Sequence, residues 1–181
     1  MIRFDLDDRT YLRGLQLGDE QVVLETVLAN YDRLRKHMHW MTPDFSIEDA
    51  RSFVFRNIDA VHAGKAFSLA IMRDERFAGS IGYVYIDTIA RKTEIGYWID
   101  GREEGKGIIS MSCRRLINYA FGDLGMNRIE IRCSVENLRS AAVPERLGFT
   151  REGVLRQAEK RDGRLHDFAM YGLLRSEWNG A

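Results

Sequence analysis

The spacing of apolar residues predicts a strand and two helices in the first third of the chain. Residues 10–17 alternate between apolar and polar side chains, as strands do. Residues 18–20 then begin a helix that is expected to run to about Tyr31. Residues 46–49, with the sequence Ser-Ile-Glu-Asp, have the form of a capping box. They begin a second helix, whose apolar positions are Phe53, Val54, Ile58 and Val61.

The pattern changes to a period of two in the middle of the chain, which predicts a meander of strands. Every second residue of 67–71 is apolar, and residues 73–76 form a charged turn. Residues 78–87 and 92–100 follow as two further strands, rich in β-branched and aromatic side chains.

The second half of the chain alternates between helical and strand-like patterns. Residues 101–107 form a glycine-bearing turn, and residues 108–124 return to helical spacing. A strand is expected over 129–135, a short helix over 138–147, and two strands within 149–174.

The order of these elements places one βαβ-like unit, between Thr93 and Val135, inside an otherwise antiparallel sheet. This is an α+β fold, and the length predicts that residues 1–181 form a single domain.

Composition excludes several classes of function. Lysine plus arginine number 27 and aspartate plus glutamate number 27, so there is no basic excess of the kind that nucleic-acid binding needs. The 2 cysteines form no CxxC pair, and His37 and His39 have no identifiable third ligand, so we expect no structural metal. The sequence has neither a signal-like start nor a membrane-length apolar run, which predicts a cytoplasmic protein without a membrane partner.

The glycine turn is the first candidate site. Residues 104–108, Glu-Gly-Lys-Gly-Ile, lie between a strand and a helix, where free backbone N–H groups and the helix dipole hold anions. Lys106 and Arg102 add positive charge nearby. A turn of this kind on its own is also a common tight connection, and its spacing fits neither a Walker loop nor a dinucleotide fingerprint.

Four segments carry a more specific signal when they are taken together with their order and spacing. They are EIGYWID at 94–100, EGKGI at 104–108, NRIE at 127–130 and NLRSAAVPERLGF at 137–149. This combination resembles the GCN5-related N-acetyltransferases, especially the branch that acetylates ribosomal-protein serines. The likeness continues through Glu152-Gly153, Gln157-Ala158-Glu159 and His166-Asp167 to Glu177-Trp178, and so covers most of the chain.

The resemblance implies an acetyl-coenzyme A (acetyl-CoA) site between two splayed strands. In that family, the pantetheine arm enters the opening and pairs with strand backbone, while the pyrophosphate rests on the glycine turn. The cofactor-binding residues implied for this chain are Tyr97, Trp98, Ile99, Glu104, Gly105, Lys106, Gly107, Ile108, Ile109, Asn137, Arg139 and Ser140.

This sequence departs from the family pattern at both ends of the site. Glu104 and Ile109 replace the usual first and last residues of the phosphate loop, and an acid beside phosphates is expected to weaken binding. Pro144 stands where many members carry a tyrosine general acid, so the acid must lie elsewhere or be absent.

Two carboxylates are candidates for the base that accepts the proton of the acceptor amine. Glu159 matches the glutamate proposed for this role in the ribosomal-protein-serine branch and is preferred, while Glu94 matches a catalytic glutamate of other members. Ser140 matches a serine near the cofactor sulfur and is the candidate for stabilising the thiolate. The simpler alternatives are a solvated strand position for either glutamate and a helix-capping role for the serine.

Other residues are open to a functional and a structural interpretation. His166 and Asp167 either orient a proton relay or have a structural role, and Cys133 is expected to be a small apolar strand residue. Trp40 and Phe45 are expected to close over the acceptor.

The sequence therefore predicts direct transfer of acetyl from acetyl-CoA to a primary amine. The preferred acceptor is the N-terminal amine of a protein beginning with Ser or Ala. The alternatives are a small amine, such as an aminoglycoside or polyamine, and a non-catalytic acyl-CoA sensor. The family also implies a homodimer.

Overall fold

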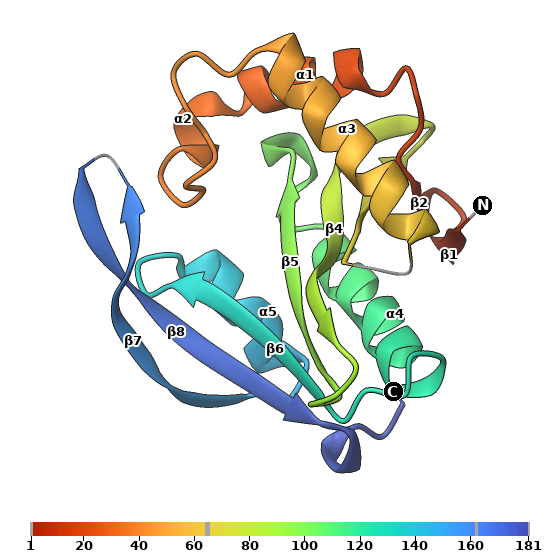
Figure 1. Ribbon diagram of the computed structural model, residues 1–181, viewed down its shortest axis with the longest axis vertical. Helices are drawn as coiled ribbons and strands as arrows, with labels where there is room; N and C mark the ends of the chain where they lie inside the picture. The colour runs from red at the N-terminus through yellow and green to blue at the C-terminus, as the bar shows by residue number, and fades with distance from the viewer. Residues whose placement is uncertain (1, 64–65, 162, 181) are drawn as a thin grey trace.

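The eight strands of the chain form one open sheet in a computed structural model that describes residues 2–63, 66–161 and 163–180. The strand order is β1-β2-β3-β4-β5-β6-β8-β7 (Figure 1). All neighbours are antiparallel except β5 and β6, which are parallel. The strands are β1 (Arg3–Asp7), β2 (Thr10–Gly14), β3 (Ser68–Arg73), β4 (Arg76–Asp87), β5 (Lys92–Ile99), β6 (Arg128–Ser134), β7 (Thr150–Arg161) and β8 (Arg164–Leu174).

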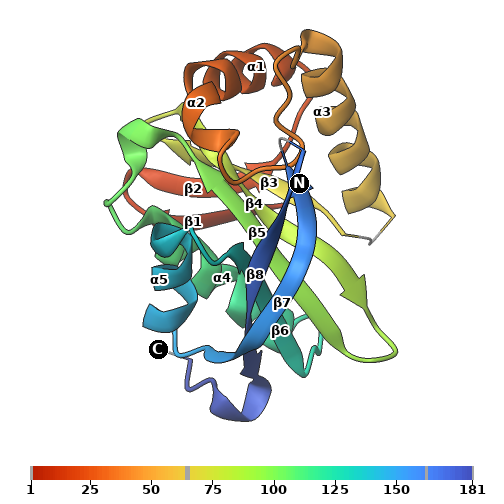
Figure 2. The same cartoon turned by 90° about the vertical axis from the view of Figure 1, so that its left-hand side faces the viewer.

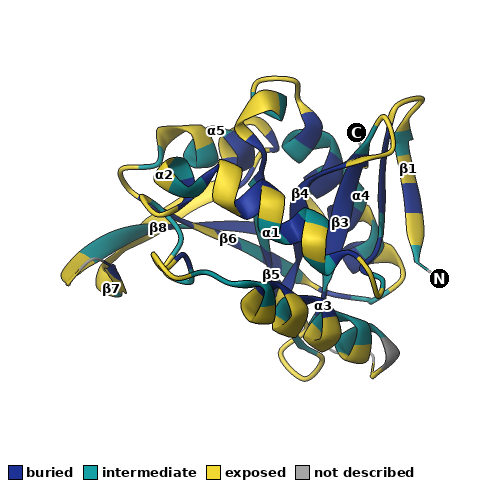
Figure 3. Ribbon diagram, turned by 90° about the horizontal axis from the view of Figure 1, so that it is seen from above, coloured by how far each residue is buried: buried dark blue, intermediate teal, exposed yellow. Residues whose placement is uncertain are grey.

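Helices cover both faces of the sheet. The N-terminal helices lie on one face, and α4 and α5 lie on the other (Figures 2 and 3). The helices are α1 (Glu20–Ala29), α2 (Tyr31–Leu34), α3 (Ile47–His62), α4 (Ile108–Gly122) and α5 (Leu138–Arg146), with short 3-10 turns η1 (Gly101–Glu103) and η2 (Arg175–Glu177). This is the α+β class that the sequence predicted. None of the helices in the described ranges is long and apolar enough to cross a membrane.

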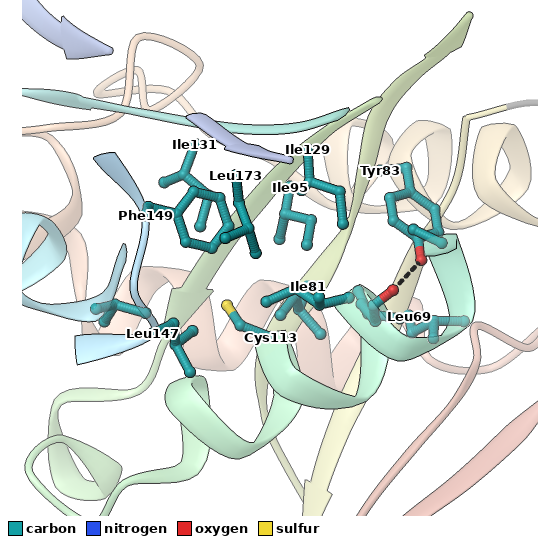
Figure 4. Close-up of a cluster of buried hydrophobic side chains, with 14 of the residues drawn as sticks. Leu69, Ile81, Tyr83, Ile95, Cys113, Ile129, Ile131, Leu147, Phe149 and Leu173 are labelled. Atoms are coloured by element: carbon teal, nitrogen blue, oxygen red, sulfur yellow. Dashed lines mark hydrogen bonds between the residues drawn. The ribbon is translucent and has the colours of Figure 1, made fainter. Parts of the chain in front are cut away.

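The larger core lies between the sheet and α4. Figure 4 shows its side chains, in which Ile81, Ile95 and Ile129 from three strands surround Cys113 of α4. Tyr83 reaches the same helix, where its hydroxyl donates to the carbonyl oxygen of Leu116 at 2.6 Å. Burial of each large apolar side chain contributes about 1.5–3 kcal/mol, so this layer fixes α4 against the central strands.

A second core holds α1 and α3 against the opposite face of β2, β3 and β4. The predicted capping box begins α3: the backbone N–H of Ser46 donates to Asp49 Oδ2 at 2.9 Å, and the Ser46 hydroxyl accepts from the Asp49 N–H at 3.4 Å. Val54 of α3 is fully buried in this layer. The capping-box prediction is confirmed.

The structure differs from the predicted elements mainly near the N-terminus. The strand expected over 10–17 ends at Gly14, and an additional strand, β1, precedes it. The first helix ends at Ala29, two residues before its predicted end at about Tyr31, and α2 begins after Asn30. Asn30 Oδ1 accepts from the Gly101 N–H at 2.8 Å, so this junction is tied to the glycine turn after β5.

Candidate active site

The sheet opens at its centre because β5 and β6 pair over only three positions. Lys92, Thr93 and Glu94 face Arg128, Ile129 and Glu130, and no further pairs follow among the described residues. Beyond this point β5 continues along β4, and β6 continues along β8, so the two strands diverge (Figure 1). The facing edges beyond Glu94 therefore leave strand backbone groups available to an extended ligand.

The open part of β5 sends its side chains to opposite faces. Tyr97 points toward α5, where its hydroxyl donates to the carbonyl oxygen of Ser140 at 3.1 Å. Trp98 points to the other face, with its ring centroid 6.2 Å from that of Trp40. Ile99 is buried, and its carbonyl oxygen accepts from Arg33. The predicted cofactor strand thus contacts both helical layers.

The glycine turn forms a cradle at the start of α4. Gly105 and Gly107 both have left-handed backbones, with φ of 75° and 76°, and Gly107 is the N-cap of the helix. Side chains disfavour this conformation, so glycine fits both places. The N–H groups of the first helical turn have no intrahelical acceptor, and they begin here at Ile108 and Ile109. The geometry is suited to a phosphate.

Charge around the cradle is arranged differently from the expectation. Glu104 is not an isolated acid, because its two oxygens are paired with Arg33, at 2.6 Å, and with Arg139. Lys106, expected to face phosphate, is bound to Glu103 at 2.9 Å. Arg102 is likewise bound to Asp100. The acid that departs from the family pattern is therefore neutralised by two arginines from different helices.

The start of α5 brings polar groups to the face of the opening that α4 covers. Asn137 caps the helix by accepting from the Ser140 N–H at 3.1 Å. The Ser140 hydroxyl donates to the Tyr97 hydroxyl at 3.2 Å. Burial raises the pKa of Tyr97 far above its usual range, so the phenol stays protonated. The cap is therefore Asn137, which leaves the Ser140 hydroxyl for the Tyr97 contact.

Cys133 lies in the same neighbourhood. It is buried near the end of β6, as expected for a small apolar strand residue. Burial raises the pKa of its thiol, and a hydrogen bond with Ser140 opposes that shift. Pro144 is buried within α5 and offers no proton, whereas Tyr97 places a phenol beside Ser140. The sequence predicted Tyr97 as a cofactor-binding residue and also fitted a position in the sheet core or the acceptor wall, but it gave no signal for this contact with Ser140.

Glu94 lies at the last paired position before the strands separate. Its carboxylate accepts from Arg132 at 2.9 Å, and its side chain is 8% exposed. Burial raises the pKa of Glu94, and the guanidinium of Arg132 opposes the shift. The group has a perturbed pKa of the kind found in proton-transfer sites, but it is also held in an ion pair.

Glu159 lies on the β7–β8 hairpin, after a bulge. Gln157 adopts a left-handed backbone with φ of 53°, and its N–H donates to Asp167 Oδ1 at 2.7 Å. The bulge carries Glu159 to the segment after α2, where its Oε2 lies 3.0 Å from Nδ1 of His39. The other oxygen lies 3.3 Å from Nε of Arg161.

His166 and Asp167 each make a separate structural contact. Asp167 supports the bulge, and Nδ1 of His166 lies 3.6 Å from Glu136. Instead, His39 contacts the candidate base. The sequence carried no signal for this contact, because 120 residues separate His39 from Glu159. Within the described ranges, no three His, Cys, Asp or Glu residues form a group suited to a metal.

Aromatic side chains line the face of β5 opposite Tyr97. Trp40, in the segment before α3, packs on Phe45 with centroids 6.0 Å apart, and Trp98 packs on Phe77 at 5.8 Å. Since Trp40 also contacts Trp98, these rings form one continuous apolar wall. The wall joins the segment that carries His39 to the open strand.

Comparisons with known proteins agree with this geometry. The family model described as an acetyltransferase (GNAT) domain matches residues 9–150. The ribosomal-protein-serine acetyltransferase of Escherichia coli (strain K12) is 32% identical over 152 residues, which cover 83% of this chain and 84% of that protein.

Two solved structures are similarly close. One is RimL, a ribosomal L7/L12 alpha-N-protein acetyltransferase bound to coenzyme A through a cysteine disulfide. It has a TM-score of 0.91 and 30% sequence identity, and the match covers 96% of this chain and 98% of the RimL chain. The other is the microcin C7 self-immunity acetyltransferase MccE in complex with acetyl-CoA and AMP. It has a TM-score of 0.88 and 30% sequence identity, and the match covers 93% of this chain and 94% of the MccE chain.

Proposed function

The chain belongs to the GNAT acetyltransferase family, and we propose that the acceptor of its acetyl-CoA-dependent N-acetyl transfer is the N-terminal amine of a protein beginning with Ser or Ala. The observation that carries this proposal is the position of Glu159, where an aromatic wall and the β7–β8 hairpin meet. A carboxylate is a weak base, and an α-amine, with a reference pKa near 8, needs less help to lose its proton than a lysine amine near 10.4.

The residues present fit acetyl-CoA. The unpaired edge of β5 from Ile95 to Ile99 offers backbone groups to an amide-bearing arm, and the cradle of Gly105 and Gly107 at the start of α4 suits a pyrophosphate. Bound there, acetyl-CoA supplies the thioester carbonyl that the acceptor amine attacks. Arg139 and Lys106 stand at the edge of the cradle, and each is held by an acid that phosphate oxygens would compete with.

We assign proton removal from the amine to Glu159. As the N–C bond forms and the C–S bond breaks, the carboxylate accepts one proton, directly or through water. His39 is 63% exposed and 3.0 Å from the same carboxylate, so it offers the proton a route to solvent. Glu94 is the second candidate for this role, and its ion pair with Arg132 makes it the less available base.

We assign stabilisation of the departing sulfur to Ser140, supported by Tyr97. The two hydroxyls lie 3.2 Å apart at the start of α5, and the Tyr97 phenol is a protonated donor. Cys133 adjoins Ser140. In RimL, coenzyme A forms a disulfide with a cysteine. If Cys133 is the equivalent residue here, the cofactor sulfur lies beside Ser140.

A small amine is the second candidate acceptor. The support for it is the 28% identity, over 96% of this chain, with the spermidine N(1)-acetyltransferase of Vibrio cholerae. The aromatic wall of Trp40, Phe45 and Trp98 is compatible with stacking of a flat ring as well as with a peptide.

The deciding experiment measures thiol release from acetyl-CoA with matched acceptors. One peptide has a free N-terminal Ser, a second is blocked at its N-terminus but carries a lysine, and polyamines and aminoglycosides complete the set. We expect turnover only with the free N-terminus. Turnover confined to the small amines would overturn the proposal, and no turnover from protein that binds acetyl-CoA would favour a sensor.

The homodimer and the cytoplasmic location expected from the family are part of the same proposal. Sedimentation of the purified protein with and without acetyl-CoA tests the first, and fractionation of the native cells tests the second.

A further inference from the structure

The buried end of β7 holds an arginine to which the proposed chemistry assigns no role. Arg161 is the last residue of the strand, and its side chain is 3% exposed. Its Nη1 donates to the carbonyl oxygen of Lys36, in the segment after α2. Its Nε lies 3.3 Å from Oε1 of Glu159. The guanidinium therefore lies between the proposed base and the segment that faces it.

Several polar atoms around this arginine are buried without a hydrogen-bond partner among the described residues. They are Nε and Nη2 of Arg161, Oε1 of Glu159 and Nδ1 of His37. Native proteins leave few buried polar groups unpaired, because each one costs the free energy of its lost hydration. Nε of Arg161 and Oε1 of Glu159 are in ion-pair contact at 3.3 Å, but neither forms a hydrogen bond, so the guanidinium and the carboxylate together are complementary to a ligand that carries an acceptor and a donor close together.

The first residue of a peptide has this pair of groups. Its amine nitrogen and its own carbonyl oxygen are roughly 3 Å apart when the residue is extended. That spacing is close to the 3.3 Å between Arg161 Nε and Glu159 Oε1. We propose, resting on the function proposed above, that Arg161 binds the carbonyl oxygen of the first acceptor residue while Glu159 receives the amine.

The guanidinium and the carboxylate together favour amines that have a carbonyl group next to them. An α-amino carbonyl compound satisfies both the guanidinium and the carboxylate, whereas a polyamine or a lysine side chain has no carbonyl beside its amine. A buried guanidinium also disfavours a second positive charge nearby, so it favours the neutral, nucleophilic form of the acceptor. Burial, followed by the charge of Arg161, lowers the pKa of His37, so the only buried cation of this group is the arginine.

The segment from Lys36 to His39 covers the pair from outside. It is held to the hairpin by the Arg161–Lys36 hydrogen bond and by the contact between His39 and Glu159. His39 is 63% exposed and contacts Oε2 of the carboxylate, so it can move toward solvent as the acceptor enters and leave the amine access to Oε1. The carbonyl oxygen then follows the amine toward the guanidinium.

The test compares two acceptors on two enzymes. The acceptors are a Ser-initiated peptide and its alkene isostere, in which a carbon–carbon double bond replaces the first peptide bond and removes the carbonyl oxygen. For the unaltered enzyme we expect kcat/KM to be about 10–100-fold lower with the isostere than with the normal peptide. This is the loss expected when one hydrogen bond to a charged group is removed. Arg161→Gln should lose a similar factor on the normal peptide and little more on the isostere.

Equal losses for Arg161→Gln on both acceptors, or an unaltered enzyme that does not distinguish them, would overturn the inference. If Arg161→Gln does not fold, the isostere comparison on the unaltered enzyme still decides, together with Arg161→Lys, which keeps the charge. Arg164→Gln, at the exposed position paired with Arg161 across the hairpin, is the matched control and should behave as the unaltered enzyme. Failure of the proposed function looks different: neither peptide is acetylated while small amines are.

Discussion

Oε2 of Glu159 lies 3.0 Å from Nδ1 of His39, which joins the β7–β8 hairpin to the segment before α3. The contact brings the two walls of the proposed acceptor site together at a proton-accepting group. It also gives the carboxylate a partner that is open to solvent, since the His39 side chain is 63% exposed.

Glu159→Gln should lower kcat/KM about 10²–10⁴-fold, the usual contribution of a positioned general base. Acetyl-CoA affinity should be unchanged, because the side chain lies on the acceptor side of the opening. His39→Gln should have a smaller effect on the rate. Steady-state kinetics and calorimetric binding measure the two properties, and Lys160→Gln, the exposed neighbour on β7, is the control. Full activity in Glu159→Gln, with activity lost in Glu94→Gln, would move the base to Glu94.

The hydroxyl pair at α5 is expected to act as a unit. Ser140→Ala and Tyr97→Phe should each lower kcat by about 10-fold, since each removes one hydrogen bond near the departing sulfur. The double variant should lose little more than either one, because both changes break the same 3.2 Å contact. Rapid-quench kinetics isolate the chemical step. Fully additive losses would show that the hydroxyls work independently.

Removing the acid of the phosphate cradle should strengthen cofactor binding. Glu104→Gln frees Arg33 and Arg139 from their shared partner and removes a negative charge beside the proposed pyrophosphate site. We expect the Kd for acetyl-CoA to fall about 3–10-fold at low salt, and the gain to shrink as ionic strength rises. Titration calorimetry at two salt concentrations checks this, with Glu48→Gln, an exposed acid of α3, as the control. A weaker Kd would mean that Glu104 holds the loop in its binding shape.

Glu94 should make stability depend on pH in a definite direction. Because burial raises its folded-state pKa, the folded protein binds more protons than the unfolded chain between the two pKa values. Its contribution to folding is therefore greatest below the unfolded pKa and declines as pH rises through the folded pKa. Relative to the unaltered protein, Glu94→Gln should gain stability over that interval. Urea unfolding across the acid range measures the difference, and a constant difference at all pH values would contradict the prediction.

Much of the fold was predictable because most elements bury one regular face. The capping box at Ser46 and the βαβ-like unit that contains α4 are cases where local chemistry and the apolar period agree. Strand β1 was missed although Phe4 and Leu6 alternate with charged residues, which is the signal that would have identified it. Strand β7 is exposed along nearly its whole length, so its pattern carries little information about its position.

The candidate site likewise has residues that the sequence could locate and contacts that it could not. Residues of the glycine cradle and of β5 are neighbours in the sequence, and motif spacing located them. The contacts of Glu159 with His39, of Tyr97 with Ser140 and of Glu104 with Arg33 join segments that are far apart in the chain. Only the folded backbone brings such residues together, and no single-sequence pattern records the pairing.

The short pairing of β5 with β6, over three positions, also affects how the protein unfolds locally. One portion of the sheet, β1 to β5, is joined to the other, β6 to β8, through a narrow seam of backbone bonds, with α4 and α5 packed beneath it. A bound pantetheine arm would bridge the two strand edges where the protein's own ladder stops. Coenzyme A is then expected to hold the two portions together reversibly, so that protection of the Ile95–Ile99 amides from hydrogen exchange and resistance to heat both increase with its concentration.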